Sequence, residues 1–390
     1  MTSQVKVDSI RHTGASADAI TLASDGTCTA KITNSLSNNL IINGSFQIAQ
    51  RDNSSLVVGY GSVDRWKINS GGVDEAPAHF QEDLTSSDTG PWAAGFRKAL
   101  KVRNGNQTSG AGAADYIEID QEIEAQNVVQ SNWSTTSASS YVTLSFWVKS
   151  SVAQNFYGYI RTNDNTKQLY AFETGSLSAD TWTKITKTIP GHANLDIDND
   201  TGSGLLLRFL PFYGTDYTAS MSLNAWAAYS SSSRTPDSTS TWYTTDNALF
   251  YLTGVQLTAT DYCPDYPHIS YADELSRCQR YTWKVYADEG NDDILATGMA
   301  RDTGQSRYVF QHPVEMRANP SITISGSTKA YDGSGWNAFT NSQVAKLYSN
   351  KNRFTIYAES SDTNHTSGKA CWIQQSGSNS EAYFLVSAEL

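Results

Sequence analysis

Short runs of alternating apolar and polar residues, separated by turn-forming residues, fill most of the 390-residue chain. Between residues 39 and 257 these runs recur with Gly, Ser, Asn or Asp between them, which is the pattern of short strands joined by turns. No amphipathic helices alternate with them, so the pattern excludes a parallel α/β sheet and predicts a jelly-roll β-sandwich. Strands are expected at residues 40–48, 99–102, 116–123, 141–148, 156–160, 182–189, 205–209 and 250–257.

In the strand expected at residues 141–148, the side chains separate into a core face and an outer face. Successive side chains point to opposite sides of a strand. Tyr141 and Trp147 are therefore expected on one face, which we assign to the outside. The other face, which we assign to the core, carries Val142, Leu144, Phe146 and Val148.

Smaller units flank this sandwich. Residues 1–38 contain two short alternating runs that are too small to bury a core, so we expect an arm that packs on other chains or on a larger assembly. After the sandwich, Ser270 can cap a short helix in which Tyr271, Leu275 and Cys278 share one stripe. The predicted fold class is all-β, divided into an arm (1–38), a jelly-roll sandwich (39–262), a linker with a short helix (263–280) and a smaller C-terminal β-sandwich domain (281–390).

Composition narrows the class of protein. Aromatic residues are frequent, with 21 Tyr, 13 Phe and 10 Trp, and they suit strands. A net charge of −11 without Lys and Arg clusters disfavours nucleic acid as a partner. No apolar run is long enough to span a membrane, and the first residues lack the layout of a signal peptide, so neither membrane insertion nor secretion is expected. The four cysteines are too far apart for a zinc motif or a disulfide framework.

Several motifs follow one another along the chain in an order known from one family. The longest joins a strand (Gly-Val-Gln-Leu at 254–257), a proline-marked loop and a helix (Ser-Tyr-Ala-Asp-Glu-Leu-Ser-Arg-Cys-Gln-Arg-Tyr at 270–281). Upstream are Asn-Leu-Ile-Ile-Asn-Gly-Ser-Phe at 39–46, Val-Asp-Arg-Trp at 63–66 and Gln-x-Ile-Glu at 121–124. Downstream are Pro-Val-Glu-Met-Arg-Ala-Asn-Pro at 313–320 and the final Ala-Glu-Leu at 388–390. Together they resemble the bacteriophage virion fibre proteins.

The resemblance carries expectations about function. It implies a jelly roll similar to carbohydrate-binding domains, a homotrimer, attachment to other virion proteins through the arm and contact with a host-surface glycan or receptor. It also implies a location in the virion after synthesis in the host cytoplasm. The leading hypothesis is a non-enzymatic tail or side fibre. The alternatives are a capsid-attached fibre or decoration protein, a polysaccharide depolymerase tailspike, and a free carbohydrate-binding module.

Alternating carboxylates bear on the depolymerase alternative. Glu118, Asp120, Glu122 and Glu124 share one face of an expected strand. Paired carboxylates are the acid and base of glycosidases. Four in alternation are, however, typical of a solvated strand face, which we expect here. Sequence signatures of nucleophilic or cofactor chemistry are also missing, so no catalytic residue is assigned.

Two calcium sites are conceivable, and no other cofactor is expected. Asp196, Asp198 and Asp200 precede Gly202 as in the start of a calcium loop, but the bidentate Glu is missing, so a plain loop is favoured. The second site follows from resemblance. Carbohydrate-binding jelly rolls with a similar first strand often hold one structural Ca²⁺ between their first and last strands, which implies a site at Asn43 and Asp246.

Aromatic residues in polar connections are the candidate binding residues. Flat rings can stack on the apolar faces of sugars, and binding residues usually lie in loops. The alternative is that several of them plug the ends of the sandwich. The candidates, which lie in Gly-, Ser- and Thr-rich connections, are Trp92, Trp133, Trp226, Tyr229 and Trp242.

Overall fold

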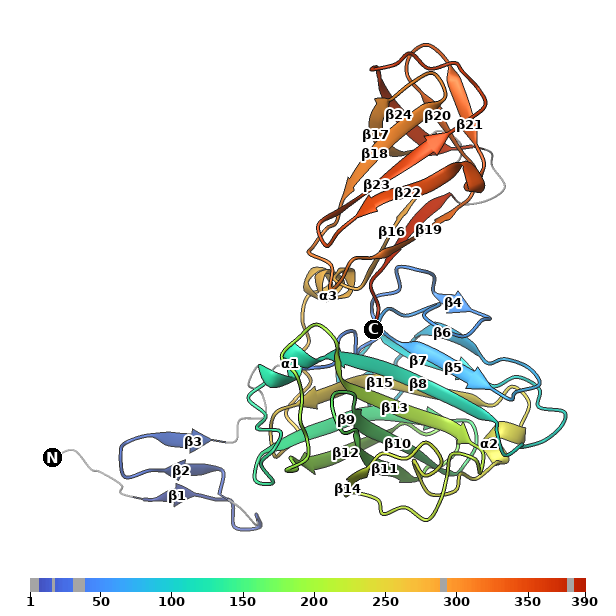
Figure 1. Ribbon diagram of the computed structural model, residues 1–390. Coiled ribbons are helices and arrows are strands. Elements are labelled where there is room, and N and C mark those ends of the chain that lie inside the picture. Colours follow the sequence, from blue (N-terminus) through green and yellow to red (C-terminus); the bar gives the residue numbers. More distant parts are fainter. Residues whose placement is uncertain (1–6, 16–17, 31–38, 288–292, 377–381) are drawn as a thin grey trace.

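The computed structural model describes residues 7–15, 18–30, 39–287, 293–376 and 382–390, and it confirms an all-β chain. Two six-stranded antiparallel sheets pack into a sandwich around the largest hydrophobic core (Figure 1). The first sheet has the order β14-β11-β10-β13-β8-β5 and contains β5 (Lys67–Gly71), β8 (Tyr116–Glu124), β10 (Asn155–Thr162), β11 (Gln168–Ser176), β13 (Ser203–Tyr213) and β14 (Trp226–Ala228). The second has the order β12-β9-β15-β7-β6-β4 and contains β4 (Ser54–Ser55), β6 (Ala78–Asp83), β7 (Lys98–Arg103), β9 (Tyr141–Ser150), β12 (Thr183–Pro190) and β15 (Leu249–Thr258).

Strand β9 divides its side chains as the alternation predicts. Tyr141 and Trp147 are half-buried on the outer face of the second sheet. The inward side chains are fully buried, and they are Val142, Leu144, Phe146 and Val148. Phe146 packs edge-on against Phe209 from the opposite sheet, with ring centroids 4.8 Å apart. The core therefore fixes which face of β9 is available to a ligand.

The prediction of a solvated carboxylate face on β8 is wrong. Glu118 and Asp120 are each only 4% exposed, and Arg208 from β13 pairs with both at 2.5 Å. Side chains from residues 217–229 pack over this part of the sheet. Burial raises the pKa of Glu118, and the neighbouring Asp120 carboxylate raises it further, whereas Arg208 opposes the shift. Alternation identifies a strand face, but it does not reveal which later segment covers that face.

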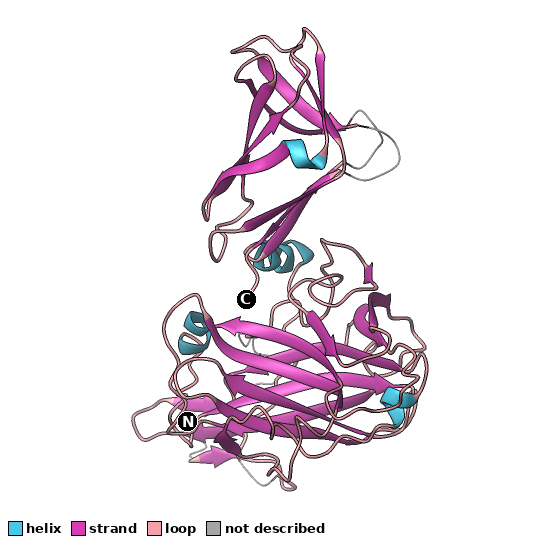
Figure 2. Cartoon of the chain, turned by 45° about the vertical axis from the view of Figure 1, so that its right-hand side comes forward, coloured by secondary structure: helices cyan, strands magenta, loops and turns pink. Residues whose placement is uncertain are grey.

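A second β unit follows the short helix α3 (Tyr271–Gln279), whose cap is confirmed because the Ser270 side chain accepts the Asp273 N–H. Figure 2 shows this unit above the sandwich. Its three-stranded sheet contains β16 (Thr282–Tyr286), β25 (Tyr383–Ser387) and β19 (Ser321–Ser325). Its seven-stranded sheet contains, in spatial order, β21 (Trp336–Phe339), β20 (Thr328–Tyr331), β24 (Ala370–Gln375), β17 (Ile294–Ala300), β18 (Gln305–Gln311), β23 (Arg353–Glu359) and β22 (Val344–Ser349). The other helices among the described residues are α1 (Ala125–Val129), α2 (Thr241–Thr244) and the 3₁₀ helix η2 (Asn341–Gln343).

The motifs that carry the sequence resemblance meet at the joint between the sandwich and this second unit. Glu389, next to the final residue, pairs with both Arg51 and Arg65, and Arg65 is 1% exposed. Across the joint, Arg280 holds the carboxylate of Glu124 through two hydrogen bonds of 2.8 Å. We therefore interpret much of the motif set as the residues that lock two β units together.

The N-terminal unit has three short strands, β1 (Ser9–Ile10), β2 (Ile20–Leu22) and β3 (Cys28–Ala30). Ile10 and Leu22 are 53% and 40% exposed, so this unit buries little of its apolar surface. The last eight residues of the predicted arm, 31–38, lie outside the described residues. Among the described helices, none is both long and apolar enough to span a bilayer.

Candidate functional site

A groove of about 370 Å³ lies on the outer face of the second sheet. Its floor comes from β9, β12 and β15, where Trp147 pairs with Lys184 on one side and Thr253 on the other. Residues 93–96 and 265–268, far apart in the sequence, supply its walls. The groove therefore exists only because two loops from separate parts of the chain approach the same sheet face.

A β-bulge shapes the floor of the groove. The register of β15 against β9 shifts between Thr253 and Gln256, and Gly254 within this stretch has φ +60°. A Cβ at Gly254 would lie 2.5 Å from the Phe96 ring, so glycine is required for this close approach. Gln256 then pairs with Ser145 on β9 and lines the groove.

Gln256 brings an amide to the floor of the groove. Its Nε2 donates to Ser145 Oγ and to the Pro264 carbonyl, both at 2.9 Å. Its Oε1 is buried and accepts no hydrogen bond from any described group. Buried polar atoms normally have a partner. This atom is therefore an unsatisfied acceptor beside the groove.

Aromatic rings form the walls. Tyr266 stands edge-on to Phe96 with centroids 4.8 Å apart, and His268 lies 5.0 Å from Tyr266. Gly95 has φ +93°, and its missing side chain leaves room for His268, whose Nε2 lies 2.9 Å from the Ala94 carbonyl. Phe96 is buried and supports the wall from behind. Together with the half-buried Trp147, the rings of Tyr266 and His268 offer flat surfaces next to the charged rim residues Lys184 and Asp265.

A second group of rings continues this outer face, and an ion pair holds it in place. Asp88 accepts hydrogen bonds from the Trp182 indole at 2.9 Å and from Lys149 at 3.0 Å. Partial burial opposes ionisation of Asp88, but these bonds and one from the Thr85 N–H keep its pKa below the usual value. The Lys149 ammonium lies 4.9 Å from the Trp182 ring and 4.5 Å from the Tyr251 ring. The side chains are therefore held in place before any ligand arrives.

Of the aromatic residues predicted from the sequence, Trp92 lies at this face. It is half-buried, packs in the same cluster as Trp147, and has the Arg97 guanidinium 3.8 Å from its ring. Trp226 and Tyr229 are also half-buried, but they belong to the other sheet. Trp226 lies on β14 and donates its indole N–H to the Pro190 carbonyl at 2.7 Å.

The assignment of Trp133 and Trp242 to a binding surface is wrong. Trp133 is 3% exposed and Trp242 is fully buried. The Trp242 indole donates to the Leu249 carbonyl at 3.0 Å, and its ring meets Phe156 and Phe250 edge-on. Both residues plug the sandwich, which is the alternative that the sequence left open.

The predicted metal sites are not assembled. The side chain of Asn43 is fully used by the Ile48 amide and by the Ile48 and Asp64 carbonyls. Asn43 also lies beside Val255, whereas the exposed Asp246 precedes the other end of β15, about 20 Å away at the usual strand rise. Among the described residues, no three His, Cys, Asp or Glu side chains are grouped to hold a metal ion. This applies to the three exposed aspartates, Asp196, Asp198 and Asp200.

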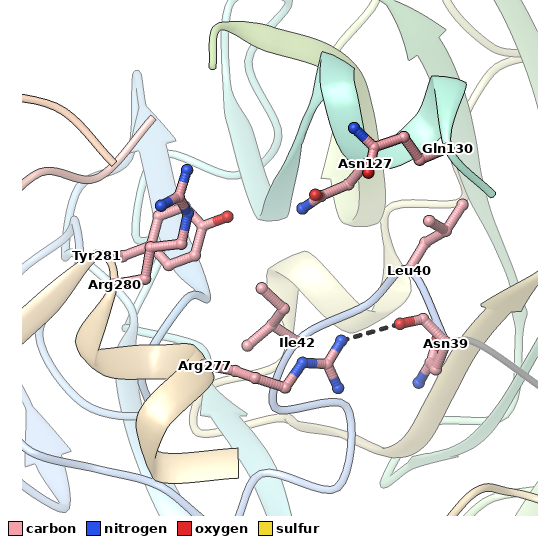
Figure 3. A pocket seen from close by; sticks show the side chains of 8 residues that line it. All are labelled: Asn39, Leu40, Ile42, Asn127, Gln130, Arg277, Arg280 and Tyr281. Carbon is pink, nitrogen blue, oxygen red and sulfur yellow. Dashed lines mark hydrogen bonds between the residues drawn. The ribbon is translucent and has the colours of Figure 1, made fainter. Parts of the chain in front are cut away.

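A smaller pocket of about 280 Å³ lies at the joint (Figure 3). Asn127 from α1 and Gln130 directly after it face Arg277 and Arg280 across the pocket. The arginines are already engaged, because Arg277 donates to the Asn39 carbonyl at 3.0 Å and Arg280 is paired with Glu124. We therefore assign this pocket to the joint and not to ligand binding.

Sequence reasoning missed most residues of the groove. Alternation placed Trp147 on the outer face, but only its position next to the loops makes it a site residue. The same alternation could have placed Lys149 and Trp182 on the outer face. Lys149 directly follows the strand predicted at 141–148, and Trp182 begins the strand predicted at 182–189. No sequence signal brings Gln256, Tyr266 or His268 together with them, because the contacts depend on the bulge and the two loops.

No protein-family description and no curated protein matches this sequence. Among solved structures, similarity is found to the enzymatically active domain of tailspike protein 4 of bacteriophage CBA120 (12% identity, TM-score 0.30), covering 57% of this chain and 21% of that chain. It is also found to an N-terminal cellulose-binding domain of a Cellulomonas fimi β-1,4-glucanase (12% identity, TM-score 0.27, 55% and 98% covered). A family 11 carbohydrate-binding module from Clostridium thermocellum is similar at 12% identity and a TM-score of 0.26, with 53% and 95% covered. Similarities this weak say nothing about what this chain binds.

Proposed function

We propose that this chain is a virion structural protein, a tail or side fibre, whose sandwich binds a host-surface glycan in the groove over β9, β12 and β15. The observation that carries the proposal is the combination of partly exposed rings and charged rim residues on one outer sheet face. Flat rings stack on sugar faces, while amides and charged groups bond hydroxyls. The assignment to a virion fibre rests on the order of the sequence motifs.

The proposed role is adhesion without catalysis. The strongest carboxylate pair, Glu118 and Asp120, is covered and bound to Arg208, so it does not flank the groove. A glycosidase needs two carboxyl groups on either side of an accessible sugar bond. We further propose a homotrimer whose N-terminal unit joins other virion proteins, since a unit that buries so little of its own surface gains from association.

The glycan proposal is tested with Trp147→Ala in the full-length chain on an array of bacterial surface polysaccharides. Loss of a stacked ring is expected to weaken binding about tenfold, which corresponds to about 1.4 kcal/mol. The matched control is Tyr141→Ala, which removes a half-buried ring from the same face of the same strand outside the groove. Unchanged binding by Trp147→Ala, with an unchanged melting temperature, contradicts the proposed site.

A further inference from the structure

We propose that the C-terminal unit carries a second saccharide site, for an acidic sugar, built from Tyr331, Trp336 and Trp372. This inference rests on the proposed function only in taking the chain to be a glycan binder. No residue of the groove belongs to the second site, and the two lie on separate β units.

The three rings form one cluster on adjacent strands. Tyr331 on β20 pairs across the sheet with Trp336 on β21 and with Trp372 on β24. The ring centroid of Tyr331 lies 4.7 Å from that of Trp336 and 5.1 Å from that of Trp372. The two tryptophan rings are 6.3 Å apart and nearly perpendicular, at 85°. The cluster is therefore a shallow aromatic corner instead of a flat layer.

The corner faces solvent. The neighbouring residues Ala330, Phe339 and Ile373 point to the core and are 0–2% exposed. Trp336 is 42% exposed, and Tyr331 and Trp372 are half-buried. The core of this unit is complete without the three outward rings. Large exposed aromatic residues of this kind are typical of recognition surfaces.

Polar groups surround the corner and select a sugar as its occupant. The Trp372 indole donates to Gln374 Oε1 at 2.9 Å, and Asn364 donates to the Trp336 carbonyl at 2.8 Å. The Ser334 and Thr366 hydroxyls lie 3.2 Å apart beside them. Hydroxyl and amide groups next to rings match the alternating apolar faces and hydroxyl edges of a sugar.

Charge narrows the class of sugar. The Lys329 ammonium lies 4.8 Å from the Trp336 ring, and Lys369 donates to Ser334 Oγ at 2.7 Å. Neither lysine forms an ion pair with a carboxylate among the described residues. On a chain of net charge −11, two such cations beside the aromatic corner favour a saccharide that carries a carboxylate or another acidic group.

The site is preorganised and lies at the free end of the molecule. The buried Asp332 carboxylate accepts the N–H groups of Ser334 at 2.8 Å and Thr366 at 2.6 Å, which fixes the β20–β21 turn. Figure 1 shows β20, β21 and β24 at the end of the C-terminal unit farthest from α3 and the sandwich. A surface at that end is placed to meet a host cell before the rest of the chain does.

The test uses the full chain and an array of bacterial capsular and O-antigen polysaccharides, with and without uronic acids. Trp336→Ala combined with Trp372→Ala is expected to weaken binding to acidic glycans at least tenfold. Lys329→Ala combined with Lys369→Ala is expected to weaken binding to acidic glycans and to leave neutral ones unchanged. The matched control is Tyr348→Ala, which removes a 71%-exposed ring from the opposite edge strand of the same sheet. If the double tryptophan variant fails to fold, Trp336→Ala alone is used for the same measurement. Its ring is the most exposed of the three, so its removal should disturb the fold least.

The outcomes separate this site from the groove. If glycan binding is lost in Trp147→Ala but unchanged in the Trp336/Trp372 and Lys329/Lys369 variants, the second site is overturned and the proposed function stands. A wild-type chain that binds no glycan on the array overturns both. A changed oligomeric mass of the tryptophan variants in light scattering assigns the corner to contact with a second copy, and it also overturns the saccharide site.

Discussion

At the scale of single residues, the tryptophans fall into a buried set and a partly exposed set. Trp242 and Trp66 are fully buried and complete the sandwich core, although Trp242 lies in a polar connection. Trp147, Trp182 and Trp336 keep part of their rings in solvent and lie beside charged or amide groups. The type of residue is the same in both groups, so its role depends on what packs against it.

Trp242→Ala is expected to lower the free energy of unfolding by about 3–5 kcal/mol, because a fully buried ring leaves a cavity and a lost hydrogen bond. The measurement is urea unfolding followed by circular dichroism. Trp92→Ala, which removes a half-buried ring at the surface, serves as the comparison and is expected to cost much less. Equal costs for both variants would show that Trp242 is not a core residue.

At the scale of elements, a network of ion pairs and hydrogen bonds forms the joint between the sandwich and the C-terminal unit. Arg65 reaches the carboxylate of Glu389 and the carbonyl of Glu122, and its guanidinium lies 3.5 Å from the Tyr281 ring. Arg317 donates to the carbonyls of Ala388 and Glu389 at 2.8 and 3.0 Å. The Arg65–Glu389 pair joins the end of the chain to a loop of the sandwich, and the Arg317 bonds fix that end within the C-terminal unit. Together they hold the two β units in a fixed orientation.

The stability of the joint is expected to depend on pH because Asp64 titrates there. Burial raises the pKa of Asp64 from 3.8 to about 6, although Arg51 and hydrogen bonds from Gln50 oppose the shift. Between these two pKa values the folded chain binds more protons than the unfolded chain. The contribution of Asp64 to stability is therefore largest at low pH and is lost as pH rises through about 6.

Comparing wild type with Asp64→Asn at pH 7 and pH 5 isolates this effect. The wild type should gain about 1 kcal/mol in unfolding free energy relative to the variant when the pH falls from 7 to 5. Urea titrations at both pH values provide the measurement. A difference between the two proteins that does not change with pH would rule out Asp64 as the titrating group.

At the scale of the whole molecule, the chain is a series of β units that differ in how much hydrophobic core each one has. The sandwich and the C-terminal unit each have a hydrophobic core, and the joint couples them. The N-terminal unit has three strands of two or three residues with exposed apolar side chains. This difference is the one expected under the proposed function, in which the N-terminal unit anchors the chain and the other two units carry the binding surfaces.

Deletion of residues 1–38 is expected to leave the melting temperature of the remaining chain nearly unchanged, because none of the segment's described residues (7–15 and 18–30) belongs to either core. The same deletion should prevent incorporation into particles, which can be scored by immunoblotting of purified virions. Normal incorporation of the truncated chain would contradict an attachment role. A large fall in melting temperature would show instead that the segment stabilises the rest of the protein.

The sequence by itself determined the properties that depend on near neighbours. Alternation predicted most of the sandwich strands, the inward face of β9 and the outward direction of Trp147, and a single Ser270 predicted the start of α3. The strand expected at residues 40–48 is wrong, because that segment forms bends and turns whose side chains are buried. The correct predictions share one property. These predictions hold because strand faces and helix caps depend on residues a few positions apart.

Only the tertiary structure decided which outward faces remain open. The carboxylates of β8 alternate as on a solvated strand, yet residues 217–229 pack over the part of the sheet that holds Glu118 and Asp120, and Arg208 pairs with both of these carboxylates. The groove beside Trp147 needs a bulge at Gly254 and two loops from distant parts of the chain. The corner of Tyr331, Trp336 and Trp372 likewise exists only because β24 pairs with a hairpin that lies many residues earlier. Coverage and convergence are long-range properties, and no local pattern of residues encodes them.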